Sequence, residues 1–257
     1  MSHAIVIEKT PFTADQLKVL LKSQYDLQML INPEWFRQGY KWYRYAMIEG
    51  AEASEHLGCK HWGPSADRDQ ANMEIIDAGA FTLCQLLEDE ILEGENENLF
   101  FEIDKIIDTI VGDMMRIGGK YEFIVAKDEP IELSAVDFYI HQLVKSEYAG
   151  WNEFLRLFGG SGSMNRDDYF YKHLGKNALF AFRQEHGYSR DEYIKVWDGK
   201  EDNTYLTKFI SEGRMGQVPV GQFNGYIKNR LLSRYSTVVG INTLTLLEPK
   251  EDPDFQG

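Results

Sequence analysis

Two pairs of acidic residues, about one helix apart in the chain, carry the chemistry that this sequence indicates. Glu49 and Glu52 form the first pair, and Glu74 and Asp77 form the second, each with the spacing i, i+3. On a helix this spacing places both carboxylates on one face. Two such helices packed antiparallel would bring four carboxylates together, and carboxylate oxygens are ligands that Mg²⁺ and Mn²⁺ prefer.

The alternative interpretation of these pairs is a solvated, charged helix face. The neighbouring residues favour a metal site instead. Glu49 shares its helical stripe with Trp42 and two alanines. The second pair shares its stripe with two alanines and Phe81. Carboxylates among such residues are partly desolvated, which is unfavourable unless a cation neutralises them.

Other catalytic or metal-binding patterns are not evident. Cys59 and Cys84 do not form a C-x-x-C pair, so a zinc site is not supported and we expect reduced thiols. His56 and His61 lie near the first acidic pair, but a di-iron site requires Glu-x-x-His on two helices, and neither pair has it.

Composition bounds the class of protein. The 257 residues are 43% hydrophobic and 13% aromatic, which is typical of a globular chain with a real core. With 41 acidic and 27 basic residues the net charge is −14, which argues against nucleic acid as a partner. The sequence contains neither a signal-peptide pattern nor an apolar run of eighteen residues. We therefore expect a cytoplasmic protein with no membrane partner.

Capping residues and apolar spacing predict the helices that position the acidic pairs. Thr13 and Gln16 form a capping box that opens a helix over 13–30. Asn32 and Pro33 are expected to open a second helix that carries the first pair and stops at Gly58. A third helix, from Asp67 to Gly94, carries the second pair, and the short link between them predicts an antiparallel hairpin.

The rest of the chain is also largely helical in pattern. We expect helices over 97–117, over 134–158 with an interruption at Gly150, and over 166–187 after an Asn165 cap. The stretch 121–125 is either a short strand or a linker. Strand-like patterns are scarce, which predicts an all-α helical bundle. Residues 213–257 form a glycine-punctuated C-terminal extension, expected to be a short irregular or β-like tail of unknown role.

A second group of polar residues lies between Lys176 and Asn203. It contains Lys176, Arg183, Tyr188 and Lys195 at a helix end and in the following loop. Basic and tyrosine side chains in such a position can hold phosphates, and they can equally be a solvated surface. The composition of the segment does not decide between these interpretations.

Three blocks of sequence together resemble the dimeric all-α dUTPases, a family within the all-α NTP pyrophosphohydrolases. They are E-G-A-E…K-H-W (49–62), E-I-I-D (74–77) and G-K-N-A-L-F-A-F-R-Q-E-H-G-Y…Y-I-K-V-W-D-G-K-E-D-N (175–203). The resemblance extends from about Asp15 to Ile210. It implies a catalytic domain over 1–212, with 213–257 outside it.

The resemblance also implies roles for individual residues. Glu49, Glu52, Glu74 and Asp77 would hold two or three Mg²⁺ ions, and Glu49 would orient and deprotonate the attacking water. The phosphate-binding residues would be Lys176, Arg183, Tyr188 and Lys195. Those near the sugar and base would be Gln24, Trp62, Phe81 and Asn177, with Gln28, Lys60 and Asn203 as further candidates.

The activity implied is hydrolysis of a deoxynucleoside triphosphate, with dUTP the first candidate, to the monophosphate and pyrophosphate. The alternatives are the same chemistry on dCTP or a modified nucleotide, and a helical protein that binds nucleotide or a partner protein without turnover. Gly79, Ala80 and Gln28 stand where the family carries other residues. Because Gly79 and Ala80 replace larger and polar groups, we expect a wider, less selective base pocket, unless Gln28, Gln24 or the C-terminal extension fills the gap. The resemblance also implies a homodimer, and the aromatic residues around the second helix, from Trp35 to Tyr45, favour it.

Overall fold

The computed structural model describes residues 12–63, 65–96, 102–118, 131–147, 150–160, 164 and 166–240. Helices dominate the described residues, and the strands β1 and β2 form a small hairpin, so the all-α class is confirmed. The chain groups into two compact units, Met1–His173 and Leu174–Gly257, which are described separately below. The expected boundary between residues 212 and 213 marks the end of a resemblance and stays a prediction.

The first helix, α1 (Ala14–Ile31), begins as its sequence predicts. The backbone N–H of Gln16 donates to Thr13 Oγ1 at 3.2 Å, and the backbone N–H of Thr13 donates to Gln16 Oε1 at 3.2 Å. This reciprocal capping box satisfies backbone donors that a helix start would otherwise leave unpaired.

The single helix expected between Asn32 and Gly58 is wrong in its first part. The chain forms a short 3₁₀ turn, η1 (Trp35–Arg37), and α2 then covers Trp42–His56. Gly39 lies between them with φ +66°, a left-handed conformation that ends a helix and that glycine adopts without strain. The break allows Trp35 and Trp42 to pack edge to face, with ring centroids 5.8 Å apart.

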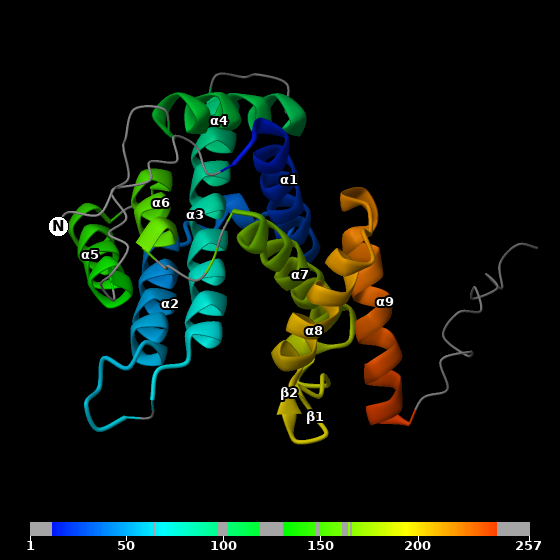
Figure 1. Cartoon of the computed structure of the whole chain (residues 1–257). Coiled ribbons are helices and arrows are strands. Elements are labelled where there is room, and N and C mark those ends of the chain that lie inside the picture. Colours follow the sequence, from blue (N-terminus) through cyan, green and yellow to red (C-terminus); the bar gives the residue numbers. More distant parts are fainter. Residues whose placement is uncertain are drawn as a thin grey trace, which may run out of the picture. The chain divides into compact units, whose positions relative to one another are not determined.

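The third helix, α3 (Arg68–Asn96), is the central element of the first unit. The carboxylate of Asp67 caps it, because Oδ1 accepts from the backbone N–H of Gln70 at 3.1 Å. Figure 1 shows α2 and α3 side by side and antiparallel, so the expected hairpin is confirmed. Helix α3 also packs against α1, and its apolar residues from Ala71 to Ile91 are largely buried.

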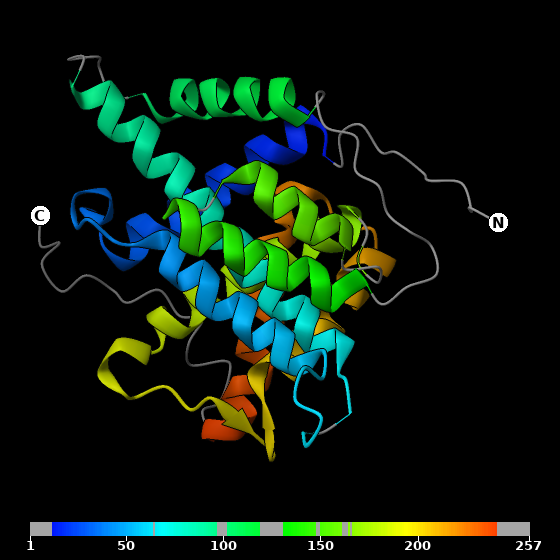
Figure 2. The same cartoon turned by 90° about the vertical axis from the view of Figure 1, so that its left-hand side faces the viewer.

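Three further helices of this unit follow α3 in the chain. They are α4 (Ile103–Gly118), α5 (Ile131–Ser146) and α6 (Trp151–Gly160). Helix α4 packs on α1 and α3, and α5 packs on α2 and α6, as Figure 2 also shows. Residues 97–101, the stretch 121–125 and the cap expected at Asn165 lie outside the described residues.

Helix α7 (Arg166–Glu185) begins in the first unit and continues into the second. There it is followed by η2 (Tyr188–Arg190), β1 (Val196–Trp197), β2 (Lys200–Glu201) and α8 (Asp202–Met215). The two antiparallel strands are joined by Asp198 and Gly199, which have φ of +47° and +78°. A two-residue turn with positive φ at both positions favours Asp-Gly, so the sequence carried a signal for this hairpin.

The irregular tail expected from residue 213 is wrong over much of its described length. Residues Val220–Val239 form a long helix, α9, which packs on α8. Glycines at 221 and 225 disfavour a helix by about 1 kcal/mol each. That penalty is offset by one buried apolar stripe with the spacing i, i+4, made of Phe223, Ile227, Leu231 and Tyr235. Residues 241–257 lie outside the described part of the chain.

Candidate functional site

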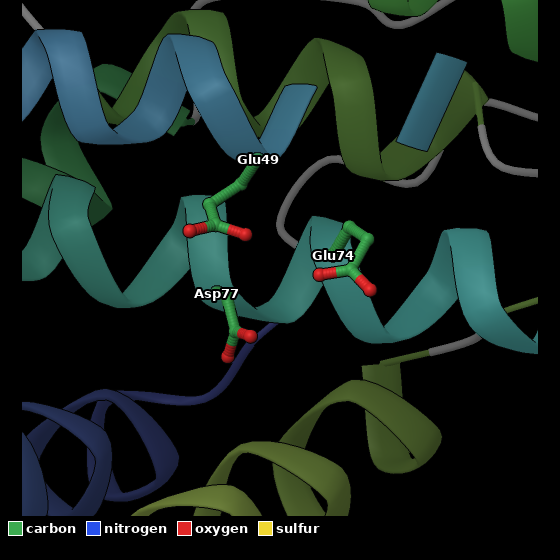
Figure 3. A group of neighbouring side chains, drawn as sticks. All are labelled: Glu49, Glu74 and Asp77. Carbon is green, nitrogen blue, oxygen red and sulfur yellow. The ribbon is translucent and has the colours of Figure 1, made fainter. Parts of the chain in front are cut away.

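Helices α2 and α3 bring three of the four predicted metal ligands together. Carboxylate oxygens of Glu49, Glu74 and Asp77 all lie within 4.8 Å of one another. Figure 3 shows Glu49 reaching from α2 toward α3, where Glu74 and Asp77 are one helical turn apart. The antiparallel hairpin that the sequence predicts is what makes these groups converge.

The electrostatics of this acidic cluster favour a bound cation. Asp77 is only 9% exposed, and Glu49 and Glu74 are half-buried. Burial, together with the negative charges of Asp77 and Glu74, raises the pKa of Glu49 well above the usual range of a glutamate. Without a cation, Glu49 is therefore protonated more readily and shares a hydrogen bond with Glu74. A divalent cation would relieve the repulsion between these groups.

The fourth predicted ligand, Glu52, is not part of the cluster. Its side chain is exposed and lines a neighbouring cavity of about 510 Å³ with Glu55, His56, Ser65 and Asp67. His56 belongs to both features, because its Nε2 lies 3.7 Å from Glu74 Oε1. Sequence reasoning considered His56 only for a di-iron site. The sequence did contain a signal for this position, because His56 follows Glu52 by one helical turn and therefore lies on the same face of α2.

Of the predicted base and sugar residues, Phe81 lies on the helical face that carries Asp77, and Gln24 of α1 contacts the same face. Asp77, Phe81 and Cys84 have the spacing i, i+4, i+7 on α3, so they share one face. From α1, Gln24 donates its amide Nε2 to Cys84 Sγ at 3.1 Å, while its Oε1 is buried without a hydrogen-bond partner. The ring of Phe81 stacks on Trp42, with centroids 6.1 Å apart. This face therefore offers a polar group and an aromatic surface beside the acidic cluster.

The other base and sugar candidates of the first unit contact residues outside the acidic cluster. Trp62 is 74% exposed and contacts the ring of His61. Lys60 forms an ion pair with Glu55, with its Nζ 2.6 Å from the carboxylate. Gln28 is 9% exposed, on the same helix as Gln24.

The absence of a side chain at Gly79 does not open a pocket, contrary to the expectation from the sequence. A Cβ placed there would lie 2.2 Å from Tyr169 Oη and 2.7 Å from Phe154 Cζ. Those two side chains already occupy the space beside Gly79. The glycine therefore serves close packing between α3 and its neighbours, and it gives no reason to expect a wider base pocket.

Three of the four predicted phosphate-binding residues are linked in the second unit: Lys176 and Arg183 contact the ring of Phe180, and Arg183 also contacts Tyr188. Lys176 Nζ lies 5.3 Å from the centroid of the Phe180 ring, and the guanidinium carbon of Arg183 lies 5.2 Å from it. The same guanidinium lies 5.8 Å from the ring of Tyr188. These distances are typical of cation–π contacts.

Arg183 has a structural partner that the sequence analysis missed. Its Nε and Nη2 donate to the carboxylate of Asp202 at 2.8 and 2.7 Å, and both residues are buried. Asp202 also accepts from Tyr193 Oη at 2.9 Å. This bidentate pair ties the end of α7 to the start of α8.

The remaining candidates of the second unit lie near this pair or on the surface. Lys195 Nζ contacts the carboxylate of Glu201 at 3.2 Å on the hairpin surface. Asn203 follows Asp202 directly, and its Oδ1 is buried without a hydrogen-bond partner. Asn177 is buried on α7 beside Lys176.

A search of protein-family models and a search of curated proteins found no match to this chain. Among the described residues, no helix is both long enough and apolar enough to cross a membrane.

Proposed function

We propose that this protein hydrolyses a deoxynucleoside triphosphate, with dUTP the first candidate, to the monophosphate and pyrophosphate in a Mg²⁺-dependent reaction. One observation carries the proposal: the convergence of Glu49, Glu74 and Asp77 from two antiparallel helices. The sequence resemblance to the dimeric all-α dUTPases supplies the substrate class and implies a homodimer. A cytoplasmic location is part of the same proposal.

The donor set of the acidic cluster fits Mg²⁺. Carboxylate oxygens are the hard ligands that this ion prefers. Those of Glu49, Glu74 and Asp77 lie within 4.8 Å of one another, so the three residues could hold one ion together. Glu74 and Asp77 would hold the ion, Glu49 would share in this, and Glu52 would join from the adjoining cavity.

Bound Mg²⁺ would neutralise charge on the triphosphate and make a bound water more acidic. Glu49 would orient the attacking water and accept its proton, because a carboxylate beside a metal-bound water can act as a general base. The water oxygen would bond to phosphorus while the bond between the α- and β-phosphates breaks. Lys176, Arg183 and Tyr188, with Lys195, would hold the phosphates and offset their charge.

The test is pyrophosphate release from each of the common deoxynucleoside triphosphates in the presence of Mg²⁺. We expect turnover by the wild-type protein and a loss of about 10³-fold or more in the Glu74→Ala, Asp77→Ala double variant, because metal ligation supplies several kcal/mol of transition-state stabilisation. Asp69→Ala, an exposed residue on the same helix, is the matched control and should retain activity.

A second measurement separates metal binding from turnover. Mg²⁺ should raise the melting temperature of the wild-type protein, since a ligand that binds only the folded state stabilises it, and should have no such effect on the double variant. Wild-type activity in the double variant would refute the assignment of the site. An absence of pyrophosphate release despite Mg²⁺ stabilisation would leave a metal-binding protein without this activity.

A further inference from the structure

Residues 187–201, here called the hairpin segment, carry two of the predicted phosphate-binding residues, Tyr188 and Lys195. The segment contains η2 and the two short strands, and several of its residues have positive φ. Asp191 and Asp198 are the non-glycine cases, with φ of +56° and +47°. Positive φ at residues other than glycine persists only where surrounding contacts hold the backbone in place.

Helix α9 supplies such contacts through one residue in particular. The hydroxyl of Tyr235 accepts a hydrogen bond from the backbone N–H of Ile194 at 3.3 Å. The Tyr235 ring stacks on Tyr193, with centroids 5.1 Å apart and planes at 20°, and its centroid lies 5.6 Å from that of Trp197. Tyr235 therefore contacts both the backbone of the hairpin segment, at Ile194, and the aromatic rings of that segment, at Tyr193 and Trp197.

Two ion pairs also join α9 to neighbouring segments of the second unit. Arg234 pairs with Asp198 at the turn of the hairpin. Lys228 Nζ lies 2.5 Å from the carboxylate of Glu185, at the end of α7. Exposed pairs of this kind contribute little on their own, so the buried contact between Tyr235 and Tyr193 is the main link between α9 and the hairpin segment.

The same contacts lead to the buried pair at Arg183. Tyr193, on which Tyr235 stacks, donates its hydroxyl to Asp202, and Asp202 holds Arg183 in a bidentate pair. Helix α9 thus reaches the neighbourhood of three predicted phosphate-binding residues through Tyr193 and the hairpin backbone.

We propose that α9 braces the hairpin segment and that Tyr235 is a positioning residue for Tyr188 and Lys195. The bracing stands on the contacts of the second unit alone, whereas the role in phosphate binding rests on the proposed function. Nothing in the sequence resemblance assigns α9 a role, because the resemblance ends at Ile210.

Hydrogen exchange of the full-length chain, followed by mass spectrometry, tests the brace. The variants are Tyr235→Phe, which keeps the ring and removes the hydroxyl, and its combination with Arg234→Gln. Arg230→Gln is the control, because Arg230 lies on the same helix and pairs with Glu212 of α8 instead. We expect exchange in 187–201 to accelerate about fivefold or more in the double variant and to stay unchanged in the control. Unchanged exchange in the double variant would overturn the brace.

Steady-state kinetics with dUTP and Mg²⁺ test the positioning role. We expect Tyr235→Phe to raise KM about threefold or more with kcat within about twofold, since a loosened segment weakens phosphate binding. A lower kcat with unchanged KM, which a smaller folded fraction would produce, would contradict positioning. If the wild-type protein hydrolyses no deoxynucleotide, the proposed function and the positioning role fail together. Hydrogen exchange still decides the brace in that case.

Discussion

Glu88 is a carboxyl side chain in surroundings that oppose its ionisation. It is buried on α3, and one oxygen, Oε2, accepts from Trp42 Nε1 at 2.9 Å. The other oxygen, Oε1, is buried without a hydrogen-bond partner. Burial raises the pKa of Glu88 to about 7, and the hydrogen bond from Trp42 opposes this only in part. Sequence patterns that mark Glu88 as one more acidic residue on a helix do not reveal this.

A raised pKa in the folded state ties Glu88 to a pH dependence of stability. Its stabilising contribution is present below the ordinary pKa of 4.5 and is lost as pH rises through about 7. We therefore expect Glu88→Gln to melt about 2–4 °C or more above the wild-type protein at pH 8.5 and close to it at pH 4.5, as followed by circular dichroism. Glu93→Gln, an exposed residue of the same helix, is the control. An equal shift at both pH values would show that charge at Glu88 is not the cause.

Gln24 has a buried polar atom that disfavours folding, and it is also a predicted base-binding residue. Its Oε1 is buried without a partner, and such groups are unfavourable for folding. Gln24→Leu should therefore leave the melting temperature unchanged or raise it. If Gln24 contacts the base, the same change should lower kcat/KM for dUTP by about 10–100-fold and weaken discrimination among bases. Gln85→Leu on α3, where Gln85 bonds Asp89, is the control. Unchanged selectivity in Gln24→Leu would remove Gln24 from the base site.

At the scale of elements, α3 both supplies ligands to the acidic cluster and packs closely against neighbouring aromatic side chains. It carries Glu74 and Asp77, whose carboxylates lie near that of Glu49, and its Gly79 allows close approach of Tyr169 and Phe154. The glycine holds this packing only because it has no side chain. Local helix propensity disfavours glycine here, so tertiary packing outweighs it.

Two glycines of α3 allow a matched test of this packing. Gly79→Ala should lower the free energy of unfolding by about 1–3 kcal/mol, because the new Cβ would overlap Tyr169 and Phe154. Gly94→Ala should raise it by about 0.5–1 kcal/mol, because nothing lies within 4 Å of a Cβ at that position. Urea denaturation of both variants measures these differences. Stabilisation by Gly79→Ala would show that the side chains beside it yield easily.

At the scale of the whole molecule, the argument for a homodimer changes once the structure is known. Trp35, Phe36 and Tyr43, which the sequence analysis took as candidates for an interface, are buried within their own unit. Exposed apolar side chains remain on the neighbouring helices α2 and α5, among them Ile48 and Val144, which are 48% and 57% exposed. The proposed dimer therefore rests on the resemblance, and these exposed side chains of α2 and α5 are candidates for its interface.

Light scattering at micromolar concentration tests the assembly. We expect a mass twice the 29.7 kDa of the chain. Val144→Glu should shift the protein toward the monomer if the α2–α5 surface forms the interface, because a charge is unfavourable in a buried apolar contact. Lys145→Glu, which changes a neighbouring exposed charge, is the control. A fully active monomer would rule the dimer out.

The local signals of the chain determined the helical class, the Thr13 capping box and the hairpin that joins Glu49 to Glu74 and Asp77. Capping hydrogen bonds and the 3.6-residue period act between residues close in sequence, so they can be recognised without a fold. The apolar stripe Phe223, Ile227 and Leu231 was such a signal too. It was missed because Gly221 and Gly225 in the same segment suggested an irregular chain.

Tertiary structure alone decided which of the singled-out residues share a site and which have other partners. It left Glu52 outside the acidic cluster, paired Arg183 with Asp202, and filled the space beside Gly79 with Tyr169. Each outcome depends on a group distant in sequence that competes for the same space or the same charge. Burial and pairing are properties of the packed molecule, and no spacing within one helix encodes them.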